Sequence, residues 1–283
     1  MQDLSGKAAF ITGGASGIGL AFGRTFARAG MKVMLADIEA DALDTAVENL
    51  RAGGLREIKG VSCDVSDLTS VCRAAEAAFN AFGKVHLVCN NAGVAGGSGI
   101  DNISIDTWRW VLDVNLMGVM HGLKTFLPHI RAHGEGGHIV NTASMAGLNS
   151  GLGLSPYSAS KFAVLNISEG LAKQVAPLGI GVTVVCPGFV RTRIADSVRN
   201  RPARYGSMPC PDPASVAGAL AARQAELAET GLDPMAVASQ VLRAVREGHL
   251  YVFTHTGPEW RNELQERFDE ILRAMDNDSR VKL

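Results

Sequence analysis

Tyr157 and Lys161 stand four residues apart in the sequence YSASK, and Ser144 lies thirteen positions before Tyr157. Four residues is just over one helical turn, so both side chains leave the same face of a helix. A phenol ordinarily has a pKa of about 10, and an ammonium about 4 Å away, at an effective dielectric of about 20, favours the phenolate by about three pKa units. The spacing therefore predicts a tyrosine that titrates near neutrality and exchanges a proton with an alcohol or a ketone.

A tyrosine and a lysine at this spacing also meet by chance in many proteins, so the chemistry needs support from elsewhere in the chain. Residues 7–12 form a short apolar run, a glycine-rich turn follows at residues 13–19, and a helical pattern covers residues 20–29. Glycines allow backbone amides to approach a pyrophosphate, and the start of the next helix offers unpaired N–H donors and a positive dipole. An ordinary flexible turn is the alternative, but a position between strand and helix predicts a dinucleotide site.

Asp37 ends a second apolar run and stands eighteen positions after Gly19. A carboxylate at the tip of the second strand can accept hydrogen bonds from both ribose hydroxyls of adenosine, and Asp37 could also, or only, cap a helix that begins near Glu39. A 2′-phosphate would bring about two negative charges beside this carboxylate and be repelled. Residues 13–19 and those directly after Asp37 contain no Arg or Lys to offset that charge. The sequence therefore predicts a preference for NAD over NADP.

Together these motifs resemble those of the short-chain dehydrogenase/reductase family, over residues 4–255 of this chain. The family's glycine motif is similar to TGGASGIG at residues 12–19, and its Asn-Asn-Ala-Gly motif is similar to residues 90–93. The resemblance implies a catalytic tetrad of Asn115, Ser144, Tyr157 and Lys161. It also implies dinucleotide contacts from Gly13, Ser16, Gly17, Ile18, Gly19, Asp37, Asp64, Val65, Asn91, Ala92, Gly93, Tyr157, Lys161, Pro187, Gly188, Val190 and Thr192.

The same resemblance implies a mechanism in which the hydroxyl of a secondary alcohol lies between Ser144 and Tyr157. Tyr157 would take the proton, and Ser144 would stabilise the developing carbonyl. Lys161 would hold the nicotinamide ribose and lower the pKa of Tyr157, and Asn115 would bond a water that leads to Lys161. We therefore expect an NAD-dependent oxidoreductase that interconverts a secondary alcohol and a ketone. An NADPH-dependent ketone or oxoacyl reductase, or a non-catalytic dinucleotide-binding sensor, is the alternative.

Apolar strand-like runs alternate with helical patterns along the chain, of which 47% is hydrophobic. This alternation predicts an α/β fold of the Rossmann type, a doubly wound parallel sheet of seven strands with helices on both faces. No Pro, Gly or Ser-rich linker divides the chain, so residues 1–283 are expected to form a single domain. Ligands of such sheets bind at the carboxyl ends of the strands. The seven runs cover residues 8–12, 32–36, 57–62, 85–89, 138–142, 180–186 and 250–254.

Composition argues against several other classes of protein. The net charge is −1, with 27 basic and 28 acidic residues, so a nucleic-acid partner is not expected. His129 and His133 lie four residues apart without a third ligand, so we expect no metal site. No apolar run reaches about 18 residues and the chain enters its first strand at once, so we expect a cytoplasmic protein without a membrane partner. Buried thiols in a reducing compartment are expected at Cys63, Cys72, Cys89, Cys186 and Cys210.

The substrate side depends on less regular segments. Residues 189–232 are long for a loop, contain several prolines and become helical around residues 214–229, which suggests a lid. With Ala95, Gly96 and residues 145–154, this segment is expected to line the substrate end. Charged groups are sparse around Ser144, which favours a neutral, fairly apolar alcohol or ketone as the small-molecule substrate.

The end of the chain adds a narrower resemblance. Residues 201–206, 231–234 and the strand and tail from residue 250 onwards resemble a subgroup that includes bacterial Cα-dehydrogenases of aryl-ether alcohols from lignin. An aromatic benzylic alcohol is therefore a possible substrate. The tail at residues 257–283 is expected to form an amphipathic helix that packs on a neighbouring subunit or on the lid. Residues 106–130 are too apolar for a solvated helix, and the family resemblance implies a homodimer or homotetramer.

Overall fold

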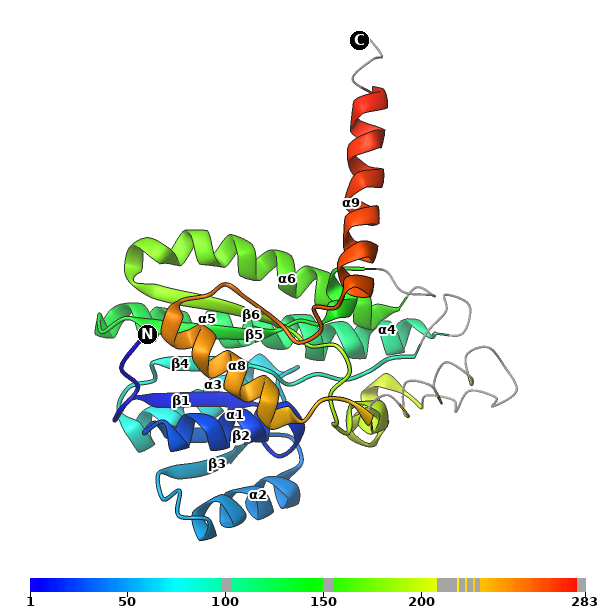
Figure 1. Ribbon diagram of the computed structural model, residues 1–283. Helices are drawn as coiled ribbons and strands as arrows, with labels where there is room; N and C mark the ends of the chain where they lie inside the picture. Colours follow the sequence, from blue (N-terminus) through cyan, green and yellow to red (C-terminus); the bar gives the residue numbers. More distant parts are fainter. Residues whose placement is uncertain are drawn as a thin grey trace.

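The computed structural model of the protein describes residues 1–97, 103–149, 155–207, 218, 222, 226 and 230–278. Its seven strands all pair in parallel and form one sheet. The strands are β1 (Ala8–Thr12), β2 (Lys32–Asp37), β3 (Ile58–Ser62), β4 (Leu87–Asn90), β5 (Gly137–Thr142), β6 (Ile180–Cys186) and β7 (Tyr251–Phe253). Their order in the sheet is β3-β2-β1-β4-β5-β6-β7 (Figure 1). The predicted seven-stranded Rossmann-type sheet in a single domain is therefore confirmed, and its order reverses between β1 and β4, where such sheets bind ligands.

Helices cover both faces of this sheet (Figure 1). On one face, the buried side chains of the strands pack with those of α1 (Gly17–Arg28), α2 (Ala40–Ala52) and α8 (Pro234–Glu247). On the other face they pack with those of α3 (Leu68–Phe82), α4 (Ile105–Leu112), α5 (Gly118–His133) and α6 (Pro156–Val175).

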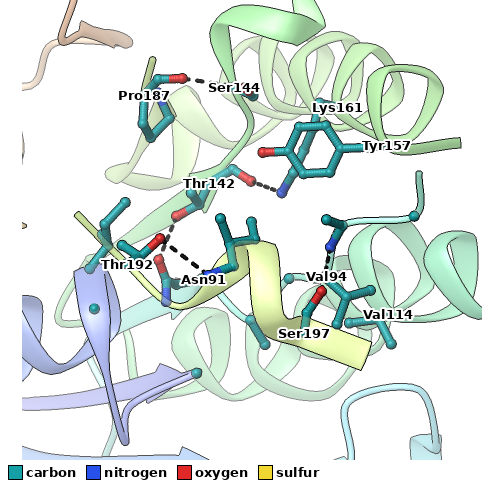
Figure 2. Close-up of a pocket in the computed structure, with 18 of the residues that line it drawn as sticks. Asn91, Val94, Val114, Thr142, Ser144, Tyr157, Lys161, Pro187, Thr192 and Ser197 are labelled. Atoms are coloured by element: carbon teal, nitrogen blue, oxygen red, sulfur yellow. Dashed lines mark hydrogen bonds between the residues drawn. The ribbon is translucent and has the colours of Figure 1, made fainter. Parts of the chain in front are cut away.

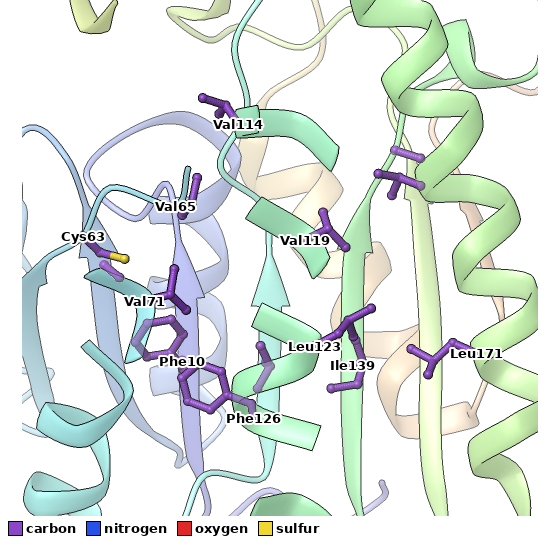
Figure 3. Close-up of a cluster of buried hydrophobic side chains, with 14 of the residues drawn as sticks. Phe10, Cys63, Val65, Val71, Val114, Val119, Leu123, Phe126, Ile139 and Leu171 are labelled. Atoms are coloured by element: carbon purple, nitrogen blue, oxygen red, sulfur yellow. The ribbon is translucent and has the colours of Figure 1, made fainter. Parts of the chain in front are cut away.

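Neighbouring residues of β1 show why the strands have unbroken apolar sequences. Phe10 belongs to the core beneath α3 and α5, and its ring centroid lies 4.5 Å from that of Phe126 (Figure 3). Ile11, the next residue, belongs to the opposite core, which contains Phe22 of α1. Successive strand residues face opposite layers, and both layers are apolar. Every position of the strand is therefore buried and favours an apolar residue.

The helical region expected at residues 106–130 is interrupted. A π-helical turn at Asp113–Met117 separates α4 from α5 and contains Asn115. Such wide turns inside α-helices are frequent at functional sites. The apolar side chains of this region divide between the core, where Trp110 and Phe126 are buried, and the surface, where Met117 remains exposed.

The tail forms a helix, as expected, and the first half of this helix contacts the rest of the chain, as far as Arg267, whose guanidinium carbon lies 5.0 Å from the ring centroid of Phe162. This helix, α9 (Pro258–Asp278), points away from the sheet and its layers (Figure 1). Trp260 in its first turn contacts the core, whereas Phe268, Ile271 and Leu272 are exposed. The predicted lid helix at residues 214–229 lies outside the described residues, except for three helical positions, and so do residues 150–154 and Cys210. Within the described ranges, no helix is long and apolar enough to cross a bilayer.

Candidate active site

A cavity of about 520 Å³ lies at the carboxyl ends of the strands around the β1–β4 switch point. Three of the four predicted catalytic residues line it, and so does every predicted cofactor contact except Gly19. Asn115, the fourth member of the tetrad, is fully buried behind the wall. The structure therefore brings these sequence-distant residues to one place. Those in the wall are Gly13, Ser16, Gly17, Ile18, Asp37, Asp64, Val65, Asn91, Ala92, Gly93, Ser144, Tyr157, Lys161, Pro187, Gly188, Val190 and Thr192.

The turn between β1 and α1 has the features that a pyrophosphate requires. A Cβ added at Gly19 would lie 2.0 Å from the carbonyl oxygen of Gly13, so only glycine permits this close turn. Ser16 precedes α1 without a side-chain capping bond, and the first turn of α1 has no acidic residue. The first N–H groups of the helix and its positive dipole are therefore available at the cavity wall. These residues fit the phosphates of a dinucleotide.

Asp37 lies beside this turn, at the tip of β2. It is 8% exposed, and its Oδ2 accepts a hydrogen bond from the Ala15 N–H at 2.9 Å. Its Oδ1 accepts from the Glu39 N–H at 3.1 Å. Glu39, not Asp37, is the residue that precedes α2. Because each carboxylate oxygen can accept two bonds, Asp37 retains acceptor sites for ribose hydroxyls.

The charge around Asp37 differs from the expectation in one respect. Near Asp37 in the sequence there is no cation, but the segment after β6 brings Arg193 and Arg199 to the same part of the cavity wall. Arg199 pairs with Glu39, although 160 positions separate them. Both arginines pair with Glu39 and Asp196. Sequence neighbours alone do not reveal these cations, because they come from a remote segment of the chain.

Asp64 follows β3 and is also tied to this segment. Its Oδ1 accepts from the backbone and side chain of Ser66, and its Oδ2 accepts from Nη2 of Arg204 at 3.1 Å. Burial alone would raise the pKa of Asp64, but the hydrogen bonds from Ser66 and Arg204 outweigh it and lower the pKa. Asp64 is therefore an anionic acceptor at the edge of the cavity.

The side chains predicted to be catalytic, Ser144, Tyr157 and Lys161, lie together at the cavity wall (Figure 2). The Lys161 Nζ donates to the carbonyl of Thr142 at 2.8 Å and lies 5.6 Å from the centroid of the Tyr157 ring. Ser144 Oγ accepts from the Ala146 N–H at 3.1 Å and donates to the Pro187 carbonyl at 3.3 Å. The predicted juxtaposition of a phenol, an ammonium and a hydroxyl is thus present in the structure.

The protonation of Tyr157 differs from the sequence expectation. Burial raises the pKa of the Tyr157 phenol above its ordinary value, and the hydrogen bond with Ser144 opposes this only in part. Burial also lowers the pKa of Lys161 to about 8. In the protein without a bound dinucleotide, the pKa of Tyr157 is therefore not near neutrality, contrary to the expectation from the sequence. Both charged forms lose hydration here, and the ammonium is directed at the Thr142 carbonyl, which limits its effect on the phenol.

Asn115 holds the loop after β4 in place. Its Oδ1 accepts from the Val94 N–H at 2.8 Å, and its Nδ2 donates to the Val94 carbonyl at 3.0 Å and to Ser160 Oγ at 3.2 Å. Both amide hydrogens are therefore used, so a water could meet this side chain only at the second lone pair of Oδ1. Gly93 leaves room there, because a Cβ at this position would lie 3.4 Å from Oδ1 and 3.5 Å from Lys161 Nζ.

The substrate end of the cavity has an aromatic wall, to which Phe189 comes from the segment expected to line it and Trp260 comes from α9, which was not expected there. Phe189, His255 and Trp260 form a cluster of rings, with centroids 5.4 to 6.3 Å apart. Phe189 and Trp260 line the cavity, and so does Glu263, whose carboxylate accepts from Asn149 Nδ2 at 3.0 Å. Trp260 and Glu263 belong to α9, and the amphipathic pattern of that helix indicated burial but not where it would dock.

A second group of titratable side chains lies at the opposite edge of the sheet. Ligand-type atoms of His86, His133 and Glu135 lie within 4.8 Å of one another, in the part of the chain that the structure describes. His86 Nδ1 accepts from the Ala8 N–H, and its Nε2 pairs with Glu135. His133 bonds the Val85 carbonyl and the Glu135 N–H, so every imidazole nitrogen already has a partner. This group is not arranged to receive an ion.

Comparison with known proteins agrees with the geometry. A model of short chain dehydrogenases matches residues 7–203. The C alpha-dehydrogenase of Sphingobium sp. (strain NBRC 103272 / SYK-6) is 34% identical over 276 residues, 97% of this chain and 88% of that protein. The 1-deoxy-11-beta-hydroxypentalenate dehydrogenase of Streptomyces exfoliatus is 33% identical over 272 residues, 95% of this chain and 90% of that protein. A short chain dehydrogenase/reductase from Burkholderia phymatum, crystallised in complex with NAD, superposes with a TM-score of 0.91 at 39% identity and covers 97% of each chain.

Proposed function

This chain belongs to the short-chain dehydrogenase family of oxidoreductases, and we propose that it interconverts a neutral, fairly apolar secondary alcohol and its ketone with NAD. The observation that carries the proposal is that Ser144, Tyr157 and Lys161 line the same cavity as the glycine turn and Asp37. A non-catalytic dinucleotide sensor would need the phosphate turn but not these three side chains. Their joint presence therefore favours an enzyme.

The residues of the cavity divide the chemistry among them. Bound nicotinamide supplies the hydride acceptor or donor. Tyr157, whose raised pKa keeps the phenol protonated at neutral pH, donates a proton to the ketone or, after deprotonation, accepts one from the alcohol. The bond from Ser144 Oγ to the Pro187 carbonyl is long, at 3.3 Å, so this hydroxyl can turn to the substrate oxygen.

Lys161 and Asn115 support this proton transfer. Lys161 is 3% exposed and held by the Thr142 carbonyl, with a pKa lowered to about 8, so it both presents charge near Tyr157 and can release a proton near neutral pH. Asn115 fixes Val94 and leaves one acceptor site toward the space beside Gly93. A water in that space would link Lys161 to solvent.

The preference for NAD rests on Asp37. Its carboxylate would accept the ribose hydroxyls and repel a 2′-phosphate. Arg193 and Arg199 favour the second candidate, an NADPH-dependent ketone or oxoacyl reductase, because guanidinium groups bind phosphates. Fluorescence titration with NADH and NADPH decides between them: tighter NADH binding is expected, and tighter NADPH binding contradicts the NAD assignment.

The aromatic wall narrows the substrate class. Phe189 and Trp260 would stack on a planar substituent, and the exposed carboxylate of Glu263 disfavours anionic substrates at the entrance. The C alpha-dehydrogenase relative supports an alcohol that bears an aromatic ring. We expect aryl secondary alcohols to give faster NADH production than alicyclic or steroid-like ones. Equal rates across such a panel would contradict the aromatic preference but not the alcohol dehydrogenase activity.

The exposed apolar side chains support a homo-oligomer. Phe268, Ile271 and Leu272 are 43 to 57% exposed along α9, and Met117 is 41% exposed between α4 and α5. A second copy of the chain would bury these groups. Light scattering should give at least a dimer, and replacement of Leu272 by Lys should weaken it if α9 takes part.

The thiols are consistent with a reducing, cytoplasmic setting. Cys63, Cys89 and Cys186 are buried and unpaired, and burial raises the pKa of Cys63 and of Cys186 to about 12. Such thiols do not form reactive thiolates at neutral pH. They therefore belong to the core and take no part in the proposed chemistry.

A further inference from the structure

The connection after β6 crosses the adenosine end of the cavity as a strap, which we define as residues 192–206. Ser197 Oγ in the strap accepts from the Ala95 N–H at 2.9 Å, and Tyr205 OH donates to Asp113 Oδ2 at 2.9 Å. Between these contacts, Arg199 reaches the turn after β2. The strap thus brings a cation from a remote part of the chain to within two residues of Asp37.

Glu39 occupies the donors of Arg199. Arg199 Nε donates to Glu39 Oε2 at 3.2 Å, and Nη2 donates to Oε1 at 2.6 Å, which is the bidentate pairing typical of Arg with a carboxylate. The remaining Nη1 donates to the carbonyls of Arg193 and Asp196 at 3.0 and 2.7 Å. Asn200 Nδ2 also donates to Glu39 Oε1, at 2.8 Å. Arg199 is therefore almost saturated.

The surrounding charges make this pairing relevant to the cofactor. Asp37, Glu39 and Asp196 are acidic, and Arg193 and Arg199 are basic, so the formal sum at this end of the cavity is −1. The side chains of Glu39 and Arg199 are each 21% exposed, so solvent screens them only in part. Without the charge of Glu39 the sum would be zero, and a neutral amide at this position would keep a single acceptor oxygen for Nε and Nη2 of Arg199, so the bidentate pairing would be lost. Two parallel N–H donors of a guanidinium are a good match for a phosphate.

We propose that Glu39 is a cofactor-specificity residue. By pairing with Arg199, it prevents this guanidinium from binding a 2′-phosphate, and so it assists Asp37 in selecting a dinucleotide with a free 2′-hydroxyl. The inference rests on the NAD preference proposed above. Arg199 would then bind a phosphate only when it is not paired with the carboxylate of Glu39. A phosphate group carries about −1.5 to −2 charges, so it would compete strongly for this guanidinium once Glu39 is neutral.

The test measures dissociation constants for NADH and NADPH by fluorescence titration, without substrate. In Glu39→Gln, the ratio of the NADPH constant to the NADH constant should fall by about tenfold or more relative to wild type. Adding Arg199→Gln to that variant should abolish the gain, because the released guanidinium is then missing. Arg199→Gln alone leaves Glu39 uncompensated and should raise the ratio, which gives a second route should Glu39→Gln fold poorly.

Arg204→Gln is the matched control, because it loosens the strap at its neighbouring anchor on Asp64 and Ser66, away from Glu39. It should change the two constants by the same factor. An unchanged ratio in Glu39→Gln, or an equal shift in Arg204→Gln, would overturn the specificity role and leave Glu39 as a simple anchor of the strap. Failure of the NAD preference itself appears separately, as NADPH binding more tightly than NADH in the wild type.

Discussion

Titratable side chains cluster at both ends of the parallel strands, which we call the carboxyl edge and the amino edge, and the cluster at the carboxyl edge lines the cavity described above. At the carboxyl edge, Ser144, Tyr157 and Lys161 line open space and keep bonding capacity to spare. At the amino edge, His86 and Glu135 pair with each other and with the backbone or Lys84. The difference teaches that proximity of ligand-type residues is not enough to make a binding site. A binding site also needs donors and acceptors that are unused and that face a cavity.

Burial lowers the pKa of a side chain at each edge, but the consequence for its protonation at neutral pH differs. Lys161 and His138 both have a pKa lowered by burial, to about 8 and about 3. At about 8, the lysine can change protonation near the working pH. At about 3, the histidine stays neutral, and its Nε2 bonds Thr183 Oγ1 at 2.8 Å, while its Nδ1 has no hydrogen-bond partner among the described residues. The same physical cause thus yields a side chain that can titrate near neutral pH at one edge and one that stays neutral at the other.

The largest effect on cofactor binding should come from the glycine turn at the carboxyl edge. In Gly19→Ala the new methyl group would lie 2.0 Å from the Gly13 carbonyl, so the turn must shift. We expect NADH binding to weaken by about 100-fold, equivalent to about 2.7 kcal/mol, as fluorescence titration would show. Gly170→Ala is the control, because nothing lies within 4 Å of its Cβ on α6. If Gly19→Ala bound NADH with wild-type affinity, the proposal that this turn binds the phosphates of the dinucleotide would be contradicted.

Asn115→Ala should damage both stability and turnover. The Val94 N–H and carbonyl would each lose their buried partner. Denaturant unfolding should show a loss of about 2–4 kcal/mol, since each unsatisfied buried group costs about 1–3 kcal/mol. The turnover number at saturating NAD should fall as well, because Val94 follows the Asn-Asn-Ala-Gly loop. A loss of stability with full turnover would restrict Asn115 to a structural role.

His138 should make the amino edge sensitive to acid. Its pKa is about 3 in the folded chain, below the ordinary histidine value of 6.5, so the unfolded state binds the proton first. The stability that the chain gains from keeping His138 neutral is fully present above pH 6.5. It is lost as the pH falls from 6.5 toward 3, because the unfolded state then binds a proton that the folded state does not. Relative to His138→Gln, the wild type should lose up to about 1.4 kcal/mol of unfolding free energy per pH unit in that window. Parallel pH curves for the two proteins would contradict this assignment.

Glu135→Gln should have the smallest effect. The carboxylate is exposed, and its contacts with Lys84 and His86 lie at the edge of the sheet remote from the cavity. We expect kcat/KM to be unchanged and thermal stability to change little, because exposed ion pairs contribute little. A marked loss of activity would mean that the amino edge is coupled to the cavity, and the contrast between the two edges would fail.

The carboxyl edge was largely predictable from sequence, because its parts are local patterns. Apolar runs located all seven strands to within two residues at each end, and the glycine turn and the Tyr157–Lys161 spacing each lie within one element. The Arg199–Glu39 pair could not be found in this way, because it depends on how a strap folds back over a distant strand. The docking of Trp260 on Phe189 likewise depends on the direction of α9. The pKa of Tyr157 depends on burial, which spacing alone does not reveal.

The central claim is that Tyr157 exchanges the proton with the substrate oxygen. Tyr157→Phe removes the hydroxyl and leaves the ring, so kcat for oxidation of a secondary alcohol should fall by about a thousandfold, while the NADH dissociation constant should change by less than about twofold. A variant that binds NADH normally and keeps a substantial fraction of wild-type kcat would contradict the account.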